Sequence, residues 1–140
     1  MIFISPITPA FGISSEERSQ NLSRLGFVAA ELARAGAAVI AAPIAPSKAS
    51  REAIKDTVLH TAGAGGNFFT IHVNTPLEHC EEHDRRGVYA KAKAGELKGV
   101  PGVDEVYEAP EKADLVVDVT TQSVPEIVHS EYFFGICGHH

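Results

Sequence analysis

The sequence predicts an α/β fold in which helices cover parallel strands. Helical and strand patterns alternate along the chain, and this order is typical of parallel strands joined by crossover helices. Residues 37–42 (AAVIAA) are apolar throughout, as expected of a strand that is buried on both faces. The chain has 140 residues, of which 44% are hydrophobic and 21% charged, so it is long enough for one domain with a core.

The first half of the chain predicts two helices around this strand. Ser14 and Glu17 have the spacing of a capping box, which indicates a helix beginning there, and Gly36 is suited to follow its end. The strand at 37–42 comes next, followed by a proline-marked loop. A second helix is predicted over about residues 49–60, with four residues facing inward: Ala53, Ile54, Thr57 and Val58.

The second half predicts two more strands, at residues 68–73 and 114–119, after a turn at 63–67. A short helix is expected to begin at Thr75, because an N-cap, a proline at the first helical position and a capping box coincide there. Ser123 and Glu126 have the spacing of another capping box, which indicates a last helix beginning there. Ligands of parallel sheets bind at the carboxyl ends of the strands, which here are 42–46, 73–76 and 119–122.

Charge and composition exclude several classes of protein. The net charge of −6 argues against a general nucleic-acid binder, and no apolar run approaches the roughly 18 residues of a membrane span. Cys80 and Cys137 have neither metal nor redox spacing, so we expect a cytoplasmic protein. The seven histidines form no His-Glu-x-x-His pattern, and no metal ligand is predicted.

Residues 84–99 are the most informative segment, because they place five cations in an otherwise acidic chain. Three glycines and Tyr89 interrupt the cations. Such a segment is able to close over a phosphorylated ligand and neutralise its charge. The alternative is a solvated surface helix, and charge alone favours that alternative.

Several segments in the same order resemble the adenylylsulfate (APS) kinase family of sulfate assimilation. They are residues 15–29 (SEERSQNLSRLGFVA), 75–81 (TPLEHCE), the basic segment and 107–111 (YEAPE). The resemblance covers about residues 12–130. It implies a three-layer parallel sheet of the P-loop kinase type over residues 14–130, with a lid at 84–104. Residues 1–13 and 131–140 look unlike the family.

Within the family, residues 36–46 and 111–118 look most like the C-terminal domain of fungal ATP sulfurylase. That domain is an allosteric module that binds PAPS. The resemblance implies ligand contacts with PAPS or APS at seven positions: Arg18, Asn21, Ile44, Ala45, Arg86, Gly99 and Val100. Each position also has a plain structural interpretation, as a solvated polar residue or as packing.

Three departures from the kinase pattern predict that this chain is catalytically inactive. It contains no Gly-x-x-x-x-Gly-Lys-Ser/Thr, the motif that holds phosphates and Mg²⁺, so ATP and Mg²⁺ are expected to be lost as cofactors. Ala45 stands where the kinases carry serine. Val100 stands where they carry a phenylalanine that would stack on adenine.

The phosphate-loop strand of the family has no counterpart before Ser14, so we expect an N-terminally truncated chain with an incomplete sheet. Residues 1–4 supply at most one strand, which does not resemble the missing one. Each buried, unpaired backbone group costs about 1 to 3 kcal/mol, and the isolated chain is therefore predicted to be marginally stable.

The resulting functional prediction is a PAPS- or APS-binding regulatory domain of a sulfate adenylyltransferase. A sulfurylase domain and further copies of the chain are its expected partners, with neither nucleic acid nor membrane. One alternative is an adenylylsulfate kinase that phosphorylates the 3′-OH of APS. The other is a fragment without function.

Overall fold

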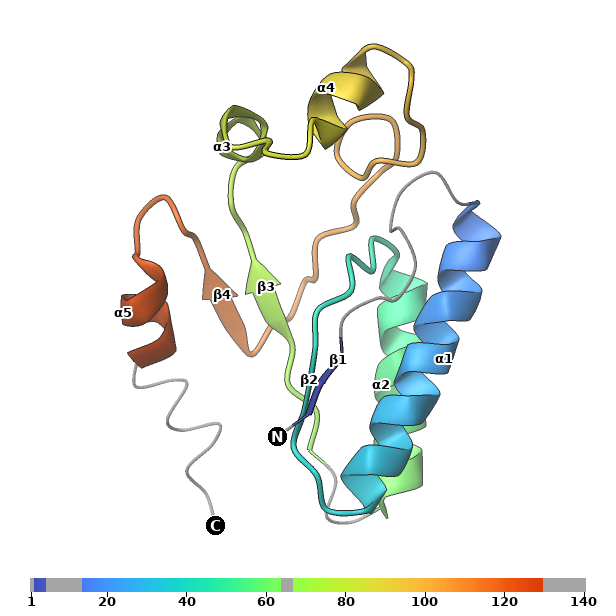
Figure 1. Ribbon diagram of the computed structural model, residues 1–140. Helices are drawn as coiled ribbons and strands as arrows, with labels where there is room; N and C mark the ends of the chain where they lie inside the picture. The colour runs from blue at the N-terminus through green and yellow to red at the C-terminus, as the bar shows by residue number, and fades with distance from the viewer. Residues whose placement is uncertain (1, 5–13, 64–66, 130–140) are drawn as a thin grey trace.

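A computed structural model describes residues 2–4, 14–63 and 67–129 and has an α/β fold (Figure 1). The predicted alternation is confirmed. Its elements, in chain order, are β1 (Ile2–Ile4), α1 (Ser15–Arg34), β2 (Val39–Ala41), α2 (Lys48–Ala62), β3 (Ile71–Val73), α3 (Leu77–Glu82), α4 (Val88–Lys93), β4 (Leu115–Val117) and α5 (Val124–His129). None of the helices in these residues is both long and apolar enough to cross a bilayer.

The strands form two separate parallel pairs. β1 pairs with β2, with Ile2 opposite Val39, and β3 pairs with β4, with Ile71 opposite Leu115. In Figure 1, α1 and α2 lie on one side of the strands and α5 on the other. The parallel α/β class is thus confirmed, but no ladder within the described residues joins β2 to β3.

This division leaves apolar strand residues open to solvent. Between 39% and 60% of the surface remains accessible at Ile40, Ile71, Val73 and Val116. These residues come from both strand pairs. The sheet residues therefore contribute little to the buried core, which lies elsewhere.

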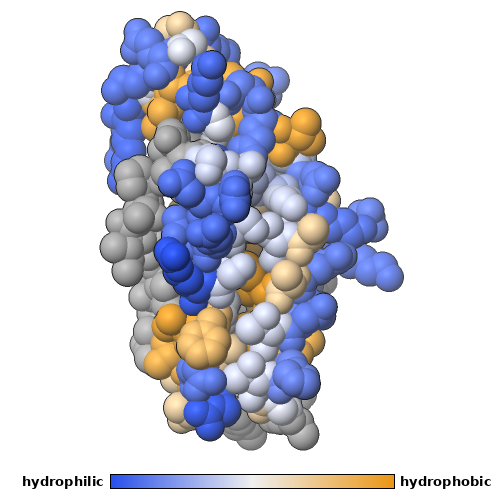
Figure 2. Space-filling view, turned by 90° about the vertical axis from the view of Figure 1, so that its right-hand side faces the viewer, coloured by the Kyte–Doolittle hydropathy of each residue, from blue (hydrophilic) through white to orange (hydrophobic). Residues whose placement is uncertain are grey.

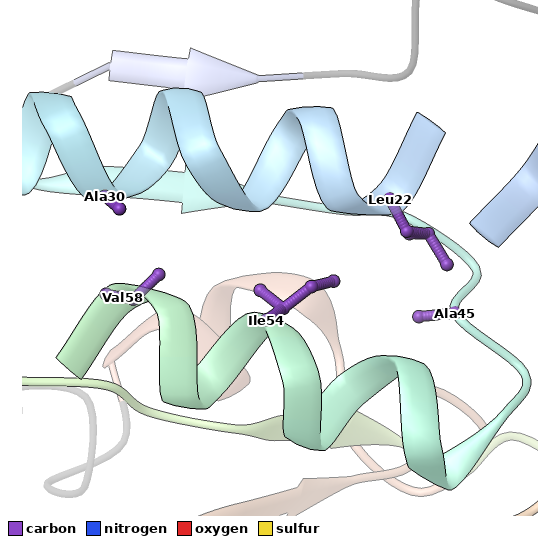
Figure 3. Close-up of a cluster of buried hydrophobic side chains, with 5 residues drawn as sticks. All are labelled: Leu22, Ala30, Ala45, Ile54 and Val58. Atoms are coloured by element: carbon purple, nitrogen blue, oxygen red, sulfur yellow. The ribbon is translucent and has the colours of Figure 1, made fainter. Parts of the chain in front are cut away.

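The core lies mainly between α1 and α2 (Figure 3). Its five buried members are Leu22, Ala30, Ala45, Ile54 and Val58. Gly26 allows the two helices to approach closely, because a Cβ at this position would lie 3.2 Å from the Ile54 side chain. The inward positions of Ile54 and Val58 are confirmed, whereas Ala53 faces solvent and Thr57 is half-buried.

The N-terminal caps of α1 and α5 are confirmed. The Glu17 amide donates to the Ser14 hydroxyl over 3.2 Å, and the Ser14 amide donates back to the Glu17 carboxylate over 2.9 Å. The Ser14 hydroxyl also donates to the Glu17 carboxylate over 2.9 Å, and the hydrogen bonds to this carboxylate, first from the Ser14 amide and then from the hydroxyl, lower the pKa of Glu17. Ser123 and Glu126 make the same reciprocal contacts at α5.

The predicted start of α3 is wrong by one residue. Thr75 does not cap the helix; Pro76 occupies the N-cap with φ −55° and ψ 141°, and no side chain caps this end. The Thr75 hydroxyl is instead buried without a hydrogen-bond partner in the described part of the chain. The strands are also shorter than predicted, since β3 begins only at Ile71 and β4 ends at Val117.

Some predictions fall on residues that the structure does not describe. They concern residues 5–13, the middle of the turn at 63–67 and the tail at 131–140. β1 confirms that the N-terminal residues supply one strand.

The side of the molecule that carries α1 shows mostly hydrophilic side chains with a few apolar ones between them (Figure 2).

Candidate functional site

Within residues 84–104, the predicted lid, Val88–Lys93 form the short helix α4, and a carboxylate accepts hydrogen bonds at its N-terminus. Asp84 accepts hydrogen bonds from the amides of Val88 and Tyr89, each over 2.8 Å, and from Ala90 over 3.2 Å. Desolvation alone would raise the pKa of Asp84, but the backbone hydrogen bonds together outweigh it and lower the pKa. Gly87 precedes α4 with φ 65°, a conformation that glycine adopts without strain.

A shallow pocket of about 260 Å³ lies between α3 and α4. Two adjacent arginines, Arg85 and Arg86, line it together with the Tyr89 ring, and both arginines are exposed. The remaining lining residues are Cys80, His83, Asp84 and Val88. Burial raises the pKa of Tyr89, with a smaller contribution from Cys80, so the phenol is a neutral hydrogen-bonding group at this wall. The pocket therefore offers two cations and a neutral hydroxyl to an anionic ligand, beside the Asp84 carboxylate, which accepts the first amides of α4.

Arg18 joins α1 to the end of the lid. Its side chain is only 9% exposed and forms an ion pair with Glu105, and it donates a second hydrogen bond to the Gly99 carbonyl over 2.8 Å. The remaining guanidinium nitrogen, Nε, is buried without a partner in the described part of the chain. Arg18 is thus a buried cation, rather than the solvated first-turn residue of the plain alternative.

A second carboxylate shapes the loop that Arg18 contacts. Asp104 accepts the Gly99 amide over 2.8 Å and the Val100 amide over 2.7 Å. These hydrogen bonds, the one from Gly99 first, lower the pKa of Asp104. Val100 is 1% exposed and forms the centre of this loop. Gly99 has φ 73°, so the turn itself requires a residue that tolerates positive φ.

The loop after β2 holds two more predicted positions. Ala45 is buried in the core with φ 42°, in the left-handed region where a non-glycine residue is strained. Its carbonyl accepts a hydrogen bond from Arg51 over 2.8 Å, which holds the loop against α2. Ile44 beside it is half-buried. Asn21 is half-buried on α1 and accepts a hydrogen bond from Arg24 over 3.3 Å.

The structure brings only some of the predicted residues together. Arg18 contacts Gly99 directly, and Val100 shares the Asp104 carboxylate with Gly99. Arg86 lies instead on the pocket between α3 and α4. A role in ligand binding stays a prediction for all seven residues.

Sequence reasoning missed the acidic partners of this site. Asp84 had a local signal, since an aspartate shortly before a helix commonly accepts its first amides. Asp104 also has a local partner, because the Gly99 amide from which it accepts a hydrogen bond lies five positions earlier in the chain. Glu105 had no signal, because its partner Arg18 is 87 positions away.

Comparison with known proteins identifies relatives over most of the chain. The family profile described as adenylylsulphate kinase matches residues 5–118. A sulfate adenylyltransferase of Aspergillus terreus is 60% identical over 123 residues, which are 88% of this chain and 21% of the relative. One of Mycosarcoma maydis is 60% identical over 126 residues, 90% of this chain and 22% of the relative. The chain thus spans about a fifth of these relatives.

Solved structures agree with the family profile. The APS kinase CysC of Mycobacterium tuberculosis, in complex with AMPPNP and APS, superimposes with a TM-score of 0.80 at 31% identity. The match covers 90% of this chain and 74% of the kinase. A second structure, of APE1195, gives a TM-score of 0.80 at 29% identity and covers 98% of this chain and 79% of the other. On these matches in sequence and fold, the chain belongs to the adenylylsulphate kinase family.

Proposed function

We propose that this domain binds a sulfated adenine nucleotide, PAPS or APS, and that it regulates a sulfate adenylyltransferase instead of catalysing phosphoryl transfer. The observation that carries nucleotide binding is the exposed pair Arg85 and Arg86 on the pocket between α3 and α4. The planar guanidinium group presents a fork of N–H donors that pairs with two oxygens of a phosphate or sulfate group at once. The solved APS kinase that resembles this chain holds AMPPNP and APS.

Two features support a regulatory role. The 140 residues contain no Gly-x-x-x-x-Gly-Lys-Ser/Thr sequence, and phosphoryl transfer depends on the charge neutralisation that this motif provides. The sequence relatives at 60% identity are sulfate adenylyltransferases, and the match covers about a fifth of their length. A domain that binds the nucleotide without an anchor for ATP fits the sensing part of such a protein.

Calorimetric titration of the folded chain with PAPS and with APS tests this proposal. Arg86→Ala should weaken binding of the nucleotide about tenfold or more, since a hydrogen bond to a charged group contributes about 1.5–3 kcal/mol. Lys55→Ala is the matched control, because it removes an exposed cation from α2, outside the pocket, and should leave binding unchanged. Absence of binding by the folded parent chain would refute the proposal and favour a fragment without function.

Adenylylsulfate kinase activity is the second candidate, favoured by the 31% identity to the solved APS kinase. Its reaction would transfer the γ-phosphoryl group of ATP to the 3′-OH of APS. A coupled assay with ATP, Mg²⁺ and APS distinguishes the two candidates. We expect turnover no higher than the background without protein, whereas turnover that Arg86→Ala reduces would establish the kinase.

A further inference from the structure

A cluster of imidazole and carboxylate groups at the C-terminal end of α3 forms a second candidate site, which shares only His83 with the lining of the pocket between α3 and α4. His79, Glu82 and His83 each offer one ligand atom, and these atoms all lie within 4.8 Å of one another. The three residues have helical i, i+3, i+4 spacing, which places them on one face. From this geometry we infer that the cluster binds a divalent transition metal ion, with Zn²⁺ as the probe of its chemistry.

The two histidine rings lie next to each other. Their centroids lie 4.2 Å apart with an angle of 33° between the planes. The His83 Nδ1 lies 2.9 Å from the His79 carbonyl oxygen. A carbonyl only accepts hydrogen bonds, so Nδ1 carries the proton and Nε2 keeps the lone pair that a metal requires. A hydrogen bond of this kind fixes the tautomer and the orientation of metal-binding histidines.

The donor set suits an ion such as Zn²⁺ better than Mg²⁺ or Ca²⁺. Imidazole nitrogen is a preferred ligand of Zn²⁺, Ni²⁺ and Cu²⁺, whereas the harder cations take oxygen ligands. Zinc–ligand bonds of about 2.0–2.1 Å in a tetrahedral arrangement place the donor atoms about 3.4 Å apart. Both His83 and Glu82 are exposed, so small side-chain rotations are able to close the remaining distance. Two imidazoles and one carboxylate leave a fourth position for water.

The surroundings of the cluster carry negative charge. Residues 78–84 contain four carboxylates and no lysine or arginine, although Glu81 pairs with Lys93 over 2.7 Å. Asp118, just after β4, lies close enough for its charge to interact with His79. The pKa of Asp118 is lowered mainly by hydrogen bonds from Thr120, with a smaller contribution from His79, so it stays an anion beside this ring. Two positive charges lie nearby, because Arg85 and Arg86 follow the cluster in the sequence and line the pocket between α3 and α4.

The sequence pattern explains why the cluster was not predicted. The pattern sought was His-Glu-x-x-His, which has its glutamate directly after the first histidine. Here the order is His-x-x-Glu-His, with the glutamate directly before the second histidine. Both patterns place two histidines four positions apart, and only the folded helix showed that a carboxylate joins them. The prediction of no metal ligand rested on this narrower pattern and on the lack of a recognised cluster of histidines with cysteines.

Titration of the full chain with Zn²⁺ by calorimetry tests the site, and Co²⁺ absorption reports the coordination geometry. The parent chain should bind one equivalent. His83→Gln and His79→Gln should each weaken binding about tenfold or more, because each removes an imidazole ligand, and Glu82→Gln should weaken it less. Circular dichroism verifies that the variants keep the helical content of the parent.

Two controls separate this cluster from other histidines. His60→Gln removes an exposed histidine in the last turn of α2 and should leave Zn²⁺ binding unchanged. The double variant His139→Gln/His140→Gln removes the adjacent histidines of the tail and should also bind one equivalent. Zn²⁺ binding that is lost in this double variant but retained in His83→Gln would overturn the inference, and so would a parent chain that binds no Zn²⁺.

Discussion

The pair of long helices and the lid are stabilised in different ways. α1 and α2 enclose most of the buried apolar side chains, with Gly26 allowing close approach. The lid and the loop after it have only Ala92 and Val100 as buried apolar residues. Hydrogen bonds to carboxylates stabilise this region instead, since Asp84 and Asp104 each accept hydrogen bonds from at least two backbone amides.

Under the proposed nucleotide binding, this difference separates a fixed support from an element that opens. Apolar packing is insensitive to small changes of charge, so the helix pair provides a fixed support. Hydrogen bonds at an exposed surface exchange readily with water, and elements with few apolar contacts open at low cost. Arg18 connects the two regions, because it belongs to α1 and contacts Glu105 and the Gly99 carbonyl at the end of the lid.

The largest effect should come from the helix pair. Ile54→Ala removes a buried side chain that contacts α1, and we expect the free energy of unfolding to fall by about 3 kcal/mol. Urea denaturation followed by circular dichroism measures this change. Leu59→Ala on the same helix is the control, since Leu59 is 38% exposed, and it should cost about 0.5 kcal/mol or less. Equal losses in the two variants would mean that the helix pair has no dominant core.

Breaking the ion pair between Arg18 and Glu105, which connects the two regions, should have an intermediate effect on the free energy of unfolding. Glu105→Ala leaves the Arg18 guanidinium buried with only the Gly99 carbonyl as a partner, and we expect a loss of about 2 kcal/mol. This value lies below the roughly 3–5 kcal/mol of a fully buried pair, because Glu105 keeps 28% exposure. Glu31→Ala breaks the exposed pair with Arg34 and should change the same urea midpoint little.

The smallest effect should be a pH dependence in the lid. The pKa of Asp104 in the folded chain lies below its ordinary value of 3.8. Its contribution to stability is therefore complete above pH 3.8 and is lost as the pH falls through the lowered pKa. Asp104→Asn should flatten the loss of stability as the pH falls below about 4, the window that follows from linkage for a carboxyl pKa lowered from 3.8. Urea midpoints across this range provide the measurement; identical slopes would show that Asp104 does not stabilise the lid.

Much of the secondary structure was predictable from local patterns. The caps at Ser14 and Ser123 join residues three positions apart, and their chemistry does not depend on distant segments. The same reasoning failed at Thr75. Its hydroxyl is buried without a hydrogen-bond partner among the residues that the structure describes, and burial is a tertiary property that a cap pattern does not contain.

The α/β class, the positions of α1, α2 and α5 and the basic character of residues 84–99 could be predicted from the sequence, because each follows from residues close together in the chain. Two other features became known only from the folded chain: Arg18 pairs with Glu105, and the strands form two separate pairs. The physical reason is how far apart the interacting residues lie in the sequence. Hydrogen bonds within a helical turn are encoded by spacing, whereas an ion pair across 87 positions exists only after the intervening chain has folded.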